Sequence, residues 1–175
     1  VLFRSCESII DRFENDKRVM PSRGQYSENP VNRSGSMLPI GELADWQDIV
    51  QNLNAKIEDL VHHYARVYVA FQRVLLSGAC SLSPLLLERI EPGQGFDWHF
   101  DGSLPEVESR VLAILLYLAD IDEGGETQLA YQMAAIKPTA GSVAVFPPYW
   151  THLHRGVTPQ AGLKYNVTSY VVLDQ

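Results

Sequence analysis

The sequence predicts a mainly β protein with helices in its N-terminal part, and two observations carry this prediction. In the first part of the chain, apolar residues recur at spacings of three and four, as in amphipathic helices. From residue 85 onward, short apolar runs alternate with glycine, proline and aspartate, as in antiparallel strands joined by turns. The length of 175 residues suits a single domain spanning 1–175, with helices and a loop over about 1–80 and a β core over about 84–173.

Two helices are expected before the β core. Residues 5–16 are predicted to form a short helix with Ser5 as its N-cap and its apolar side chains on one face. Residues 42–66 are predicted to form the longest helix, because their apolar residues make one continuous stripe. The pattern over 67–76 fits either a helix or a strand.

A long loop is expected over residues 17–41, where proline and glycine occur six times among polar residues. Long loops in compact domains are usually functional or disordered. Two interpretations therefore stay open, namely a lid that covers a substrate and a loop that has no role.

The strands expected in the β core are short and closely spaced. The predicted strands are 85–90, 96–101, 110–119, 127–131, 142–146, 152–157 and 163–173. This pattern predicts several antiparallel strands but no particular topology.

The composition narrows the classes of partner. Lysine and arginine number 14 against 21 acidic residues, so the net charge of −7 argues against binding of nucleic-acid phosphates. The longest apolar run, 111–119, is too short to cross a bilayer. The first residues have no signal-peptide pattern, and Cys6 and Cys80 suit two reduced thiols. We expect a cytoplasmic protein with no nucleic-acid or membrane partner, whose oligomeric state the sequence does not indicate.

The functional prediction depends on a histidine and an aspartate in the stretch 96–102. His99 and Asp101 are two positions apart, so an extended backbone would point both side chains to one face. An imidazole nitrogen and a carboxylate oxygen are two of the three ligands in the facial triad of non-haem Fe(II). The third ligand would be a later histidine, and both His152 and His154 are candidates. A simple hydrogen bond between His99 and Asp101 is the structural alternative.

These residues stand in a fixed order with several other motifs. The set consists of Glu91-Pro92-Gly93-Gln94, His99-x-Asp101, Tyr117-Leu118-Ala119-Asp120, Gly124-Gly125-Glu126-Thr127, and His154 followed by Gly162 and Lys164 at +8 and +10. In this order the motifs resemble those of the Fe(II)/2-oxoglutarate-dependent dioxygenases, in particular the prolyl 4-hydroxylase-like branch. The sequence is also similar to small phage and bacterial members of that family.

The resemblance implies a fold and a set of cofactors. The fold would be a double-stranded β-helix, a cupin-like jelly roll with helices outside one sheet. The iron ligands would be His99, Asp101 and His154, since the distal histidine of the family lies ten residues before a basic residue, as His154 lies before Lys164. The cofactors would be Fe(II), 2-oxoglutarate and O2, with ascorbate as an additional reductant.

The resemblance also implies a site for the cosubstrate. Lys164 would bind the far carboxylate of 2-oxoglutarate, and Tyr117 and Thr127 match positions that donate hydroxyl hydrogen bonds to the same carboxylate. Two positions depart from the family pattern, because Ile90 and Phe96 stand where tyrosines are common.

The reaction implied by the resemblance is hydroxylation of an unactivated C–H bond, coupled to oxidative decarboxylation of 2-oxoglutarate. A prolyl residue in a peptide or protein is the expected substrate, and a free amino acid or other small molecule is the alternative, because loops set specificity. A non-catalytic jelly-roll binding module is an alternative of another class, and a cupin-type enzyme without a 2-oxo acid is a third. The run from Lys164 to Tyr170 is similar to a motif of nucleic-acid demethylases, but Tyr170 replaces an arginine of that motif, and the net charge argues against that function.

Overall fold

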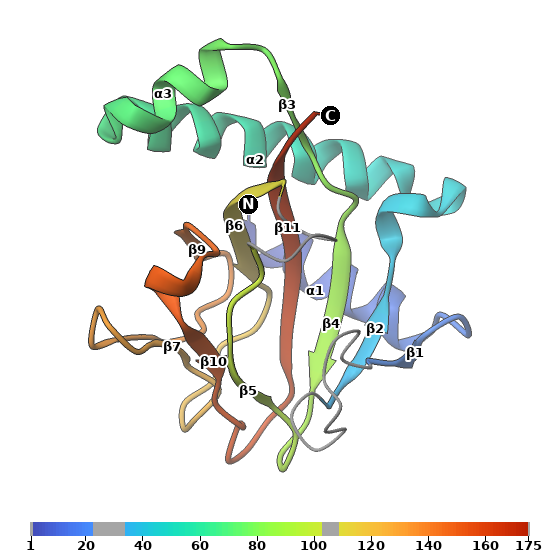
Figure 1. Cartoon of the computed structure of the whole chain (residues 1–175). Helices are drawn as coiled ribbons and strands as arrows, with labels where there is room; N and C mark the ends of the chain where they lie inside the picture. The colour runs from blue at the N-terminus through green and yellow to red at the C-terminus, as the bar shows by residue number, and fades with distance from the viewer. Residues whose placement is uncertain (1, 23–33, 103–108, 175) are drawn as a thin grey trace.

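The computed structural model of the protein describes residues 2–22, 34–102 and 109–174 (Figure 1). The helices are α1 (Leu2–Glu14), α2 (Gln47–Val67) and α3 (Val69–Leu76). The strands are β1 (Met20–Pro21), β2 (Ser36–Leu38), β3 (Cys80–Leu82), β4 (Leu86–Ile90), β5 (Phe96–His99), β6 (Arg110–Tyr117), β7 (Thr127–Leu129), β8 (Ala134–Ile136), β9 (Val143–Phe146), β10 (His154–Gly156) and β11 (Lys164–Leu173). Three 3₁₀ turns cover Ile40–Glu42, Ala44–Trp46 and Trp150–His152.

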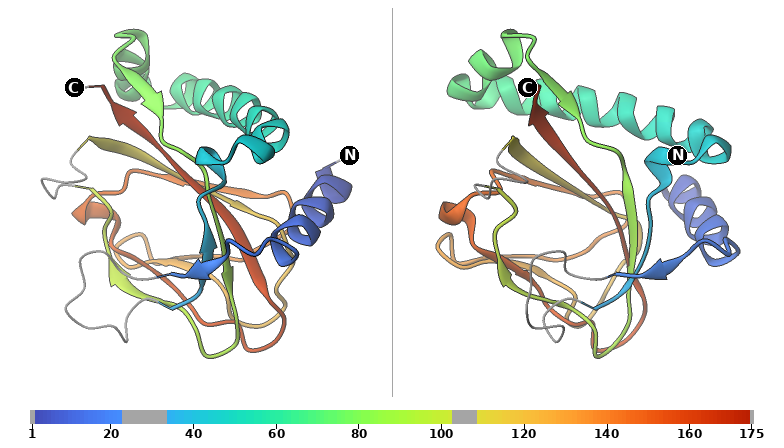
Figure 2. Two further views of the ribbon diagram at one scale, coloured as in Figure 1. Left: turned by 90° about the vertical axis from the view of Figure 1, so that its right-hand side faces the viewer. Right: turned by 45° about the vertical axis from the view of Figure 1, so that its right-hand side comes forward.

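The described strands form two antiparallel sheets that face each other as a double-stranded β-helix. The large sheet has the order β1-β2-β4-β11-β6-β9, with β3 paired to β11. The small sheet has the order β5-β10-β7-β8. Figure 2 shows the helices on one side of the large sheet and the small sheet on its other side. The expected fold class, mainly β with flanking helices, is thereby confirmed.

Strand β11 shows how the large sheet divides its side chains between two environments. Val167 and Val171 are buried in the core that the sheet shares with the helices. Lys164, Asn166 and Thr168 alternate with these valines and line a pocket between the two sheets. This alternation follows from the extended backbone, in which successive side chains point to opposite faces. The outer face is therefore structural, whereas the inner face carries polar groups.

The helices α1 and α2 each bury one apolar stripe against the outer face of the large sheet. In α1 the buried residues are Cys6, Ile9 and Phe13, and in α2 they are Val50, Leu53, Ile57, Val61 and Ala65. Each aliphatic side chain buried in this way contributes about 1.5–3 kcal/mol. The prediction of Ser5 as an N-cap is wrong, because α1 already begins at Leu2. No helix in the described parts of the chain is long and apolar enough to cross a bilayer.

Helix α2 begins later than the predicted residue 42, and the reason is a contact made by Gly41. The Gly41 N–H donates to the carbonyl oxygen of Leu85 at 3.0 Å, which docks this segment onto the chain just before β4. A Cβ atom on Gly41 would lie only 2.5 Å from the Leu85 nitrogen. The chain therefore passes through two 3₁₀ turns before the regular helix starts at Gln47.

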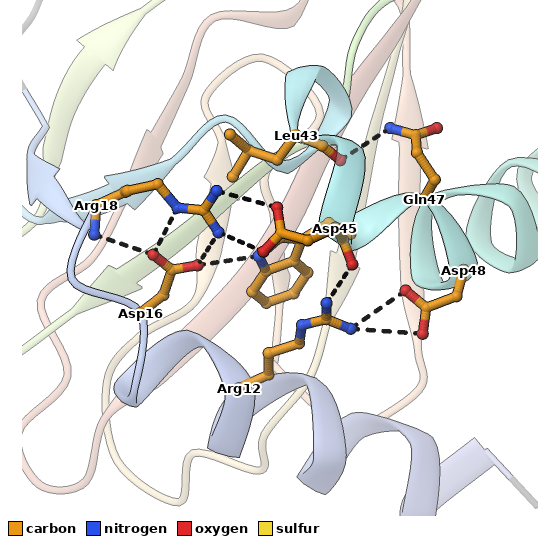
Figure 3. A network of polar contacts seen from close by, with 8 residues as sticks. Arg12, Asp16, Arg18, Leu43, Asp45, Gln47 and Asp48 are labelled. Atoms are coloured by element: carbon orange, nitrogen blue, oxygen red, sulfur yellow. Dashed lines mark hydrogen bonds and ion pairs between the residues drawn. The ribbon is translucent and has the colours of Figure 1, made fainter.

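A polar network joins the end of α1 to the start of α2 (Figure 3). Asp16 and Asp45 both form ion pairs with Arg18, at 2.6 Å and 2.7 Å. The buried indole of Trp46 donates to Asp16 at 3.0 Å, and the guanidinium of Arg12 lies over the same ring at 4.7 Å. Charged groups therefore cover and hold a core tryptophan at this junction.

The expected loop over 17–41 is wrong in its described parts, because these parts contain β1 and β2. The two strands pair with each other, and β2 pairs with β4 at the edge of the large sheet. Residues 23–33 lie outside the described residues, so the hypothesis of a lid stays a prediction. The ambiguous stretch 67–76 is largely helical as α3, and the sequence did not predict β3 or β8.

Candidate active site

Three side chains from separate elements meet at one end of the pocket between the sheets. His99 is the last residue of β5, Asp101 follows it, and His154 begins β10. The two histidines are cross-strand partners, with ring centroids 4.2 Å apart. The Asp101 carboxylate lies 3.5 Å from Nε2 of His99 and 3.3 Å from Nε2 of His154. One ligand atom from each residue lies within 4.8 Å of the other two, so the group can hold a metal ion.

Asp101 reaches this cluster by a different route from the one expected. Strand β5 ends at His99, so alternation along an extended backbone does not place the Asp101 side chain. Instead the chain bends, and the N–H groups of Asp101 and Gly102 both donate to the carbonyl oxygen of Pro148 at 2.9 Å. The carboxylate is therefore positioned by a turn that is anchored to the segment after β9.

Backbone carbonyl groups orient both imidazole rings. Nδ1 of His99 lies 2.6 Å from the carbonyl oxygen of Asp97, and Nδ1 of His154 lies 3.0 Å from that of His152. A carbonyl oxygen only accepts hydrogen bonds, so each Nδ1 donates its proton, and each Nε2 is the nitrogen that faces the Asp101 carboxylate. Metal-binding histidines commonly have this arrangement, in which the second nitrogen donates to a fixed acceptor.

The third member of the cluster is an ionised carboxylate. Burial raises the pKa of Asp101, but the hydrogen bond with His154 and the charges of His99, His154 and Arg110 outweigh it and lower the pKa to about 2. Two imidazole nitrogens and one anionic oxygen match the ligand set of the facial triad of non-haem Fe(II). The residues present therefore fit an iron centre.

His152, the other candidate for the distal ligand, lies outside the cluster. It belongs to the 3₁₀ turn Trp150–His152, and its Nδ1 atom is 3.0 Å from the hydroxyl of Thr151. The expectation that His152 and His154 share one strand is therefore wrong, because β10 starts only at His154. His152 contributes its backbone carbonyl, which orients the ring of His154.

Lys164 lies in the same pocket as the three clustered residues and is 3% exposed. Its Nζ atom lies 5.5 Å from the centre of the Tyr117 ring. Burial lowers the pKa of Lys164 to about 8, although the charges of Glu88 and Glu126 act in the opposite direction. An anion that enters the pocket would stabilise this buried ammonium.

Tyr117 and Thr127, the other predicted cosubstrate residues, lie beside Lys164 and contact each other. The Tyr117 hydroxyl donates to Oγ1 of Thr127 at 2.7 Å, and both side chains are buried. Thr127 lines the pocket, and Tyr117 supports it from behind through this bond. Burial raises the pKa of Tyr117 to about 12, so its phenol is protonated and donates.

A buried acidic group in the pocket is the feature that the sequence analysis missed. Glu88 on β4 is 3% exposed, and its Oε2 atom accepts hydrogen bonds from Nδ2 of Asn166 and Oγ1 of Thr168, both at 3.0 Å. Two signals were present in the sequence. Glu88 is a charged residue that directly follows three leucines at the start of a predicted strand. In the last predicted strand, polar residues occupy every second position from Lys164 onward.

Comparisons with known proteins agree with this geometry. The sequence profile of the 2OG-Fe(II) oxygenase superfamily matches residues 85–172. Among solved structures, the viral collagen prolyl hydroxylase of Paramecium bursaria Chlorella virus-1, in its 2OG complex, is similar with a TM-score of 0.70 and 16% identity, over 98% of this chain and 91% of that one. No curated protein sequence matches the chain.

Two further structures show the same likeness. A prolyl-4-hydroxylase of Pseudomonas putida has a TM-score of 0.66 at 16% identity, over 98% of this chain and 86% of that one. A prolyl hydroxylase of Trichoplax adhaerens, in complex with a hypoxia inducible factor peptide fragment, has a TM-score of 0.68 at 15% identity, over 98% of this chain and 76% of that one. At these identities the likeness shows the double-stranded β-helix fold.

Proposed function

Because this chain belongs to the 2OG-Fe(II) oxygenase superfamily, we propose that it hydroxylates a prolyl residue in a peptide or protein. An enzyme of this superfamily uses Fe(II), 2-oxoglutarate and O2. The observation that carries the proposal is that a metal-binding cluster and the buried cation Lys164 line the same pocket. One pocket can therefore bind both a metal ion and a dicarboxylate.

The metal ligands in this proposal are His99, Asp101 and His154. Their Nε2 atoms and the Asp101 carboxylate would hold Fe(II) on one face, leaving positions for a 2-oxo acid and O2. Bound iron, with 2-oxoglutarate and O2, supplies the oxidising power that no side chain has. The chain keeps the imidazoles in the required tautomer through the carbonyls of Asp97 and His152.

Lys164 is proposed to bind the far carboxylate of 2-oxoglutarate. The buried ammonium and an incoming carboxylate would form a charge-assisted hydrogen bond in a site from which water is largely excluded. Thr127 would donate to the same carboxylate, while Tyr117 would hold the Thr127 hydroxyl in place through the bond between them. Tyr117 is thus a positioning residue in this proposal.

A proline-containing peptide is proposed as the substrate because several similar structures are those of prolyl hydroxylases. The net charge of −7 supports a peptide over a nucleic acid, since nucleic-acid binding depends largely on basic residues. A free amino acid is the alternative that the substrate screen distinguishes.

The proposal is tested first by anaerobic titration of the metal-free protein with Fe(II) and then 2-oxoglutarate, following the weak visible charge-transfer absorption of the chelate. We expect this absorption in the wild type and its loss in Lys164→Ala at the same 2-oxoglutarate concentration. Proline-containing peptides and free proline are then compared by succinate release and by the gain of one oxygen atom in mass spectra. Failure of the wild type to bind 2-oxoglutarate would refute the proposal.

A further inference from the structure

The pocket contains a buried acid beside the buried lysine, and the sheet register explains why they are neighbours. On the paired strands β4 and β11, Ile90 lies opposite Lys164, and Glu88 lies opposite Asn166. Glu88 is therefore a diagonal neighbour of Lys164 on the same face, and diagonal pairs of long side chains about 7–8 Å apart at Cα are within reach of each other. Both residues are 3% exposed, and both line the pocket.

The Glu88 carboxylate is held in place by neutral donors. The amide of Asn166 and the hydroxyl of Thr168 both donate to its Oε2 atom, each at 3.0 Å. Asn166 also donates to the oxygen of Thr168 at 3.1 Å, so the three side chains form one connected group. Neutral donors fix the position of a carboxylate without cancelling its negative charge.

Three elements around Lys164 each present an identifiable group to it. Strand β4 contributes Glu88, β6 contributes the ring of Tyr117, and the turn before β7 contributes Glu126. The metal-binding cluster of His99, Asp101 and His154 lies in the same pocket. Burial works against the charge of Lys164, and Glu88 is the carboxylate among these neighbours, outside the metal cluster, that lines the pocket.

We propose that Glu88 is a positioning residue for the cosubstrate, which keeps Lys164 in its cationic form so that the pocket binds a carboxylate at neutral pH. This inference rests on the proposed function, because it assigns the cosubstrate carboxylate to Lys164. Glu88 also has an opposite effect, since its charge repels a dianion directly. The two effects differ in their pH dependence, because the repulsion does not depend on the protonation of Lys164, whereas the effect on Lys164 matters only near and above the lysine pKa.

The charge of Lys164 can be measured without any ligand. The chain contains four lysines, Lys17, Lys56, Lys137 and Lys164, so its lysine ¹³Cε NMR signals are few, and Lys164→Arg identifies the buried one. We expect its titration midpoint near pH 8 in the free protein. In Glu88→Gln the midpoint should fall by about one pH unit, because an opposite charge favours the ionised form.

Three further variants make this measurement decisive. Glu88→Asp keeps the charge and should restore most of the midpoint, whereas Glu88→Leu should reproduce the shift of Glu88→Gln and serves if the glutamine variant misfolds. Glu91→Gln is the matched control, because Glu91 pairs with Arg89 at 2.8 Å outside the pocket and should leave the midpoint unchanged. An unchanged midpoint in a folded neutral variant of Glu88 overturns the proposal.

The second measurement is the binding of 2-oxoglutarate to the Fe(II)-loaded protein between pH 6 and pH 9 without O2. Glu88→Gln should bind as tightly as the wild type, or more tightly, at pH 6 and about tenfold more weakly at pH 8.5, where each pH unit above the lysine pKa costs a factor of ten. In a Lys164→Arg background, Glu88→Gln should have no such pH effect, because arginine stays charged.

The outcomes separate the two proposals. Tighter binding by Glu88→Gln at every pH would mean that Glu88 acts by repulsion alone, and it would overturn the positioning role. If the wild type binds no 2-oxoglutarate at any pH, the proposed function fails, while the lysine titration still decides whether Glu88 controls the charge of Lys164.

Discussion

Nδ1 of His154 lies 3.0 Å from the carbonyl oxygen of His152, so one histidine orients another through its backbone and not through its ring. Replacement of His152 by alanine keeps this carbonyl, whereas replacement of His154 removes a proposed ligand. We expect His154→Ala to weaken Fe(II) binding by at least about 100-fold and His152→Ala to change it by less than about tenfold. Isothermal titration calorimetry of the metal-free proteins under anaerobic conditions measures the Fe(II) affinity of both variants. A larger loss of Fe(II) affinity in His152→Ala than in His154→Ala would make His152 the ligand.

Because Tyr117 and Thr127 share a hydrogen bond, replacing both should change the free energy of unfolding by a different amount from the sum of the two single replacements. The bond is 2.7 Å long and fully buried, and such a bond contributes about 1 kcal/mol. Urea unfolding of Tyr117→Phe, Thr127→Val and the double variant isolates the pairwise interaction, which we expect to be about 1 kcal/mol. If the two single effects simply add, the bond makes no net contribution.

The network around Trp46 should make the protein sensitive to acid. The hydrogen bond from Arg18 holds the pKa of Asp16 well below its usual range, against the effect of burial, and the Trp46 indole adds to this lowering. A lowered carboxyl pKa stabilises the fold above the unfolded value of about 4, and this stabilisation is lost as the pH falls below it.

Replacement of Asp16 tests this effect. At pH 7, Asp16→Asn should reduce the free energy of unfolding by about 2 kcal/mol, which is typical of hydrogen bonds to charged groups. Between pH 5 and pH 2 the variant should lose less stability than the wild type. Asp11→Asn, which changes an exposed carboxyl on α1, is the control and should follow the wild-type profile. Parallel profiles for wild type and Asp16→Asn would contradict the prediction.

Gly124 should tolerate a side chain far less well than Gly78, although both have left-handed backbones with φ of 73° and 67°. A Cβ atom on Gly124 would lie 2.3 Å from the carbonyl oxygen of Thr158, whereas nothing lies within 4 Å of one on Gly78. Gly78→Ala should cost about 1 kcal/mol of backbone strain, and Gly124→Ala about 3 kcal/mol or more. Thermal unfolding compares them, and equal losses would show that the turn at Gly124 relaxes.

The sequence could predict which residues form the site, because their spacing matches a known order of motifs. It could not predict how the fold positions some of them. Lys164, which the sequence singled out by its spacing of ten residues from His154, lies inside because it alternates with valines that point to the helices. The same alternation does not explain Asp101, since its carboxylate is placed by a turn bonded to Pro148, almost fifty residues away in the sequence. Contacts of that kind depend on how distant segments pack.

Pairing between distant strands also explains why the sequence did not predict β2 or the partners of Glu88. Ser36–Leu38 forms a strand because it pairs with β1 and β4, although its local sequence carries turn signals. The partnership of Glu88 with Asn166 and Thr168 depends on the register between β4 and β11, which a shift of one residue would abolish. A single sequence shows that Glu88 is unusual, but it does not show which residues it meets.

The position of β11 has a consequence for how the protein is made. This strand follows β4 and β6 in the chain, yet it lies between them in the sheet. During synthesis on a ribosome, β4 and β6 emerge before β11. The edges of these two strands that face β11 stay unpaired until residues 164–173 are made. Open strand edges pair readily with other chains. Nascent chains that stall before Lys164 would therefore be prone to aggregation and would depend on chaperones, even with every metal ligand already translated.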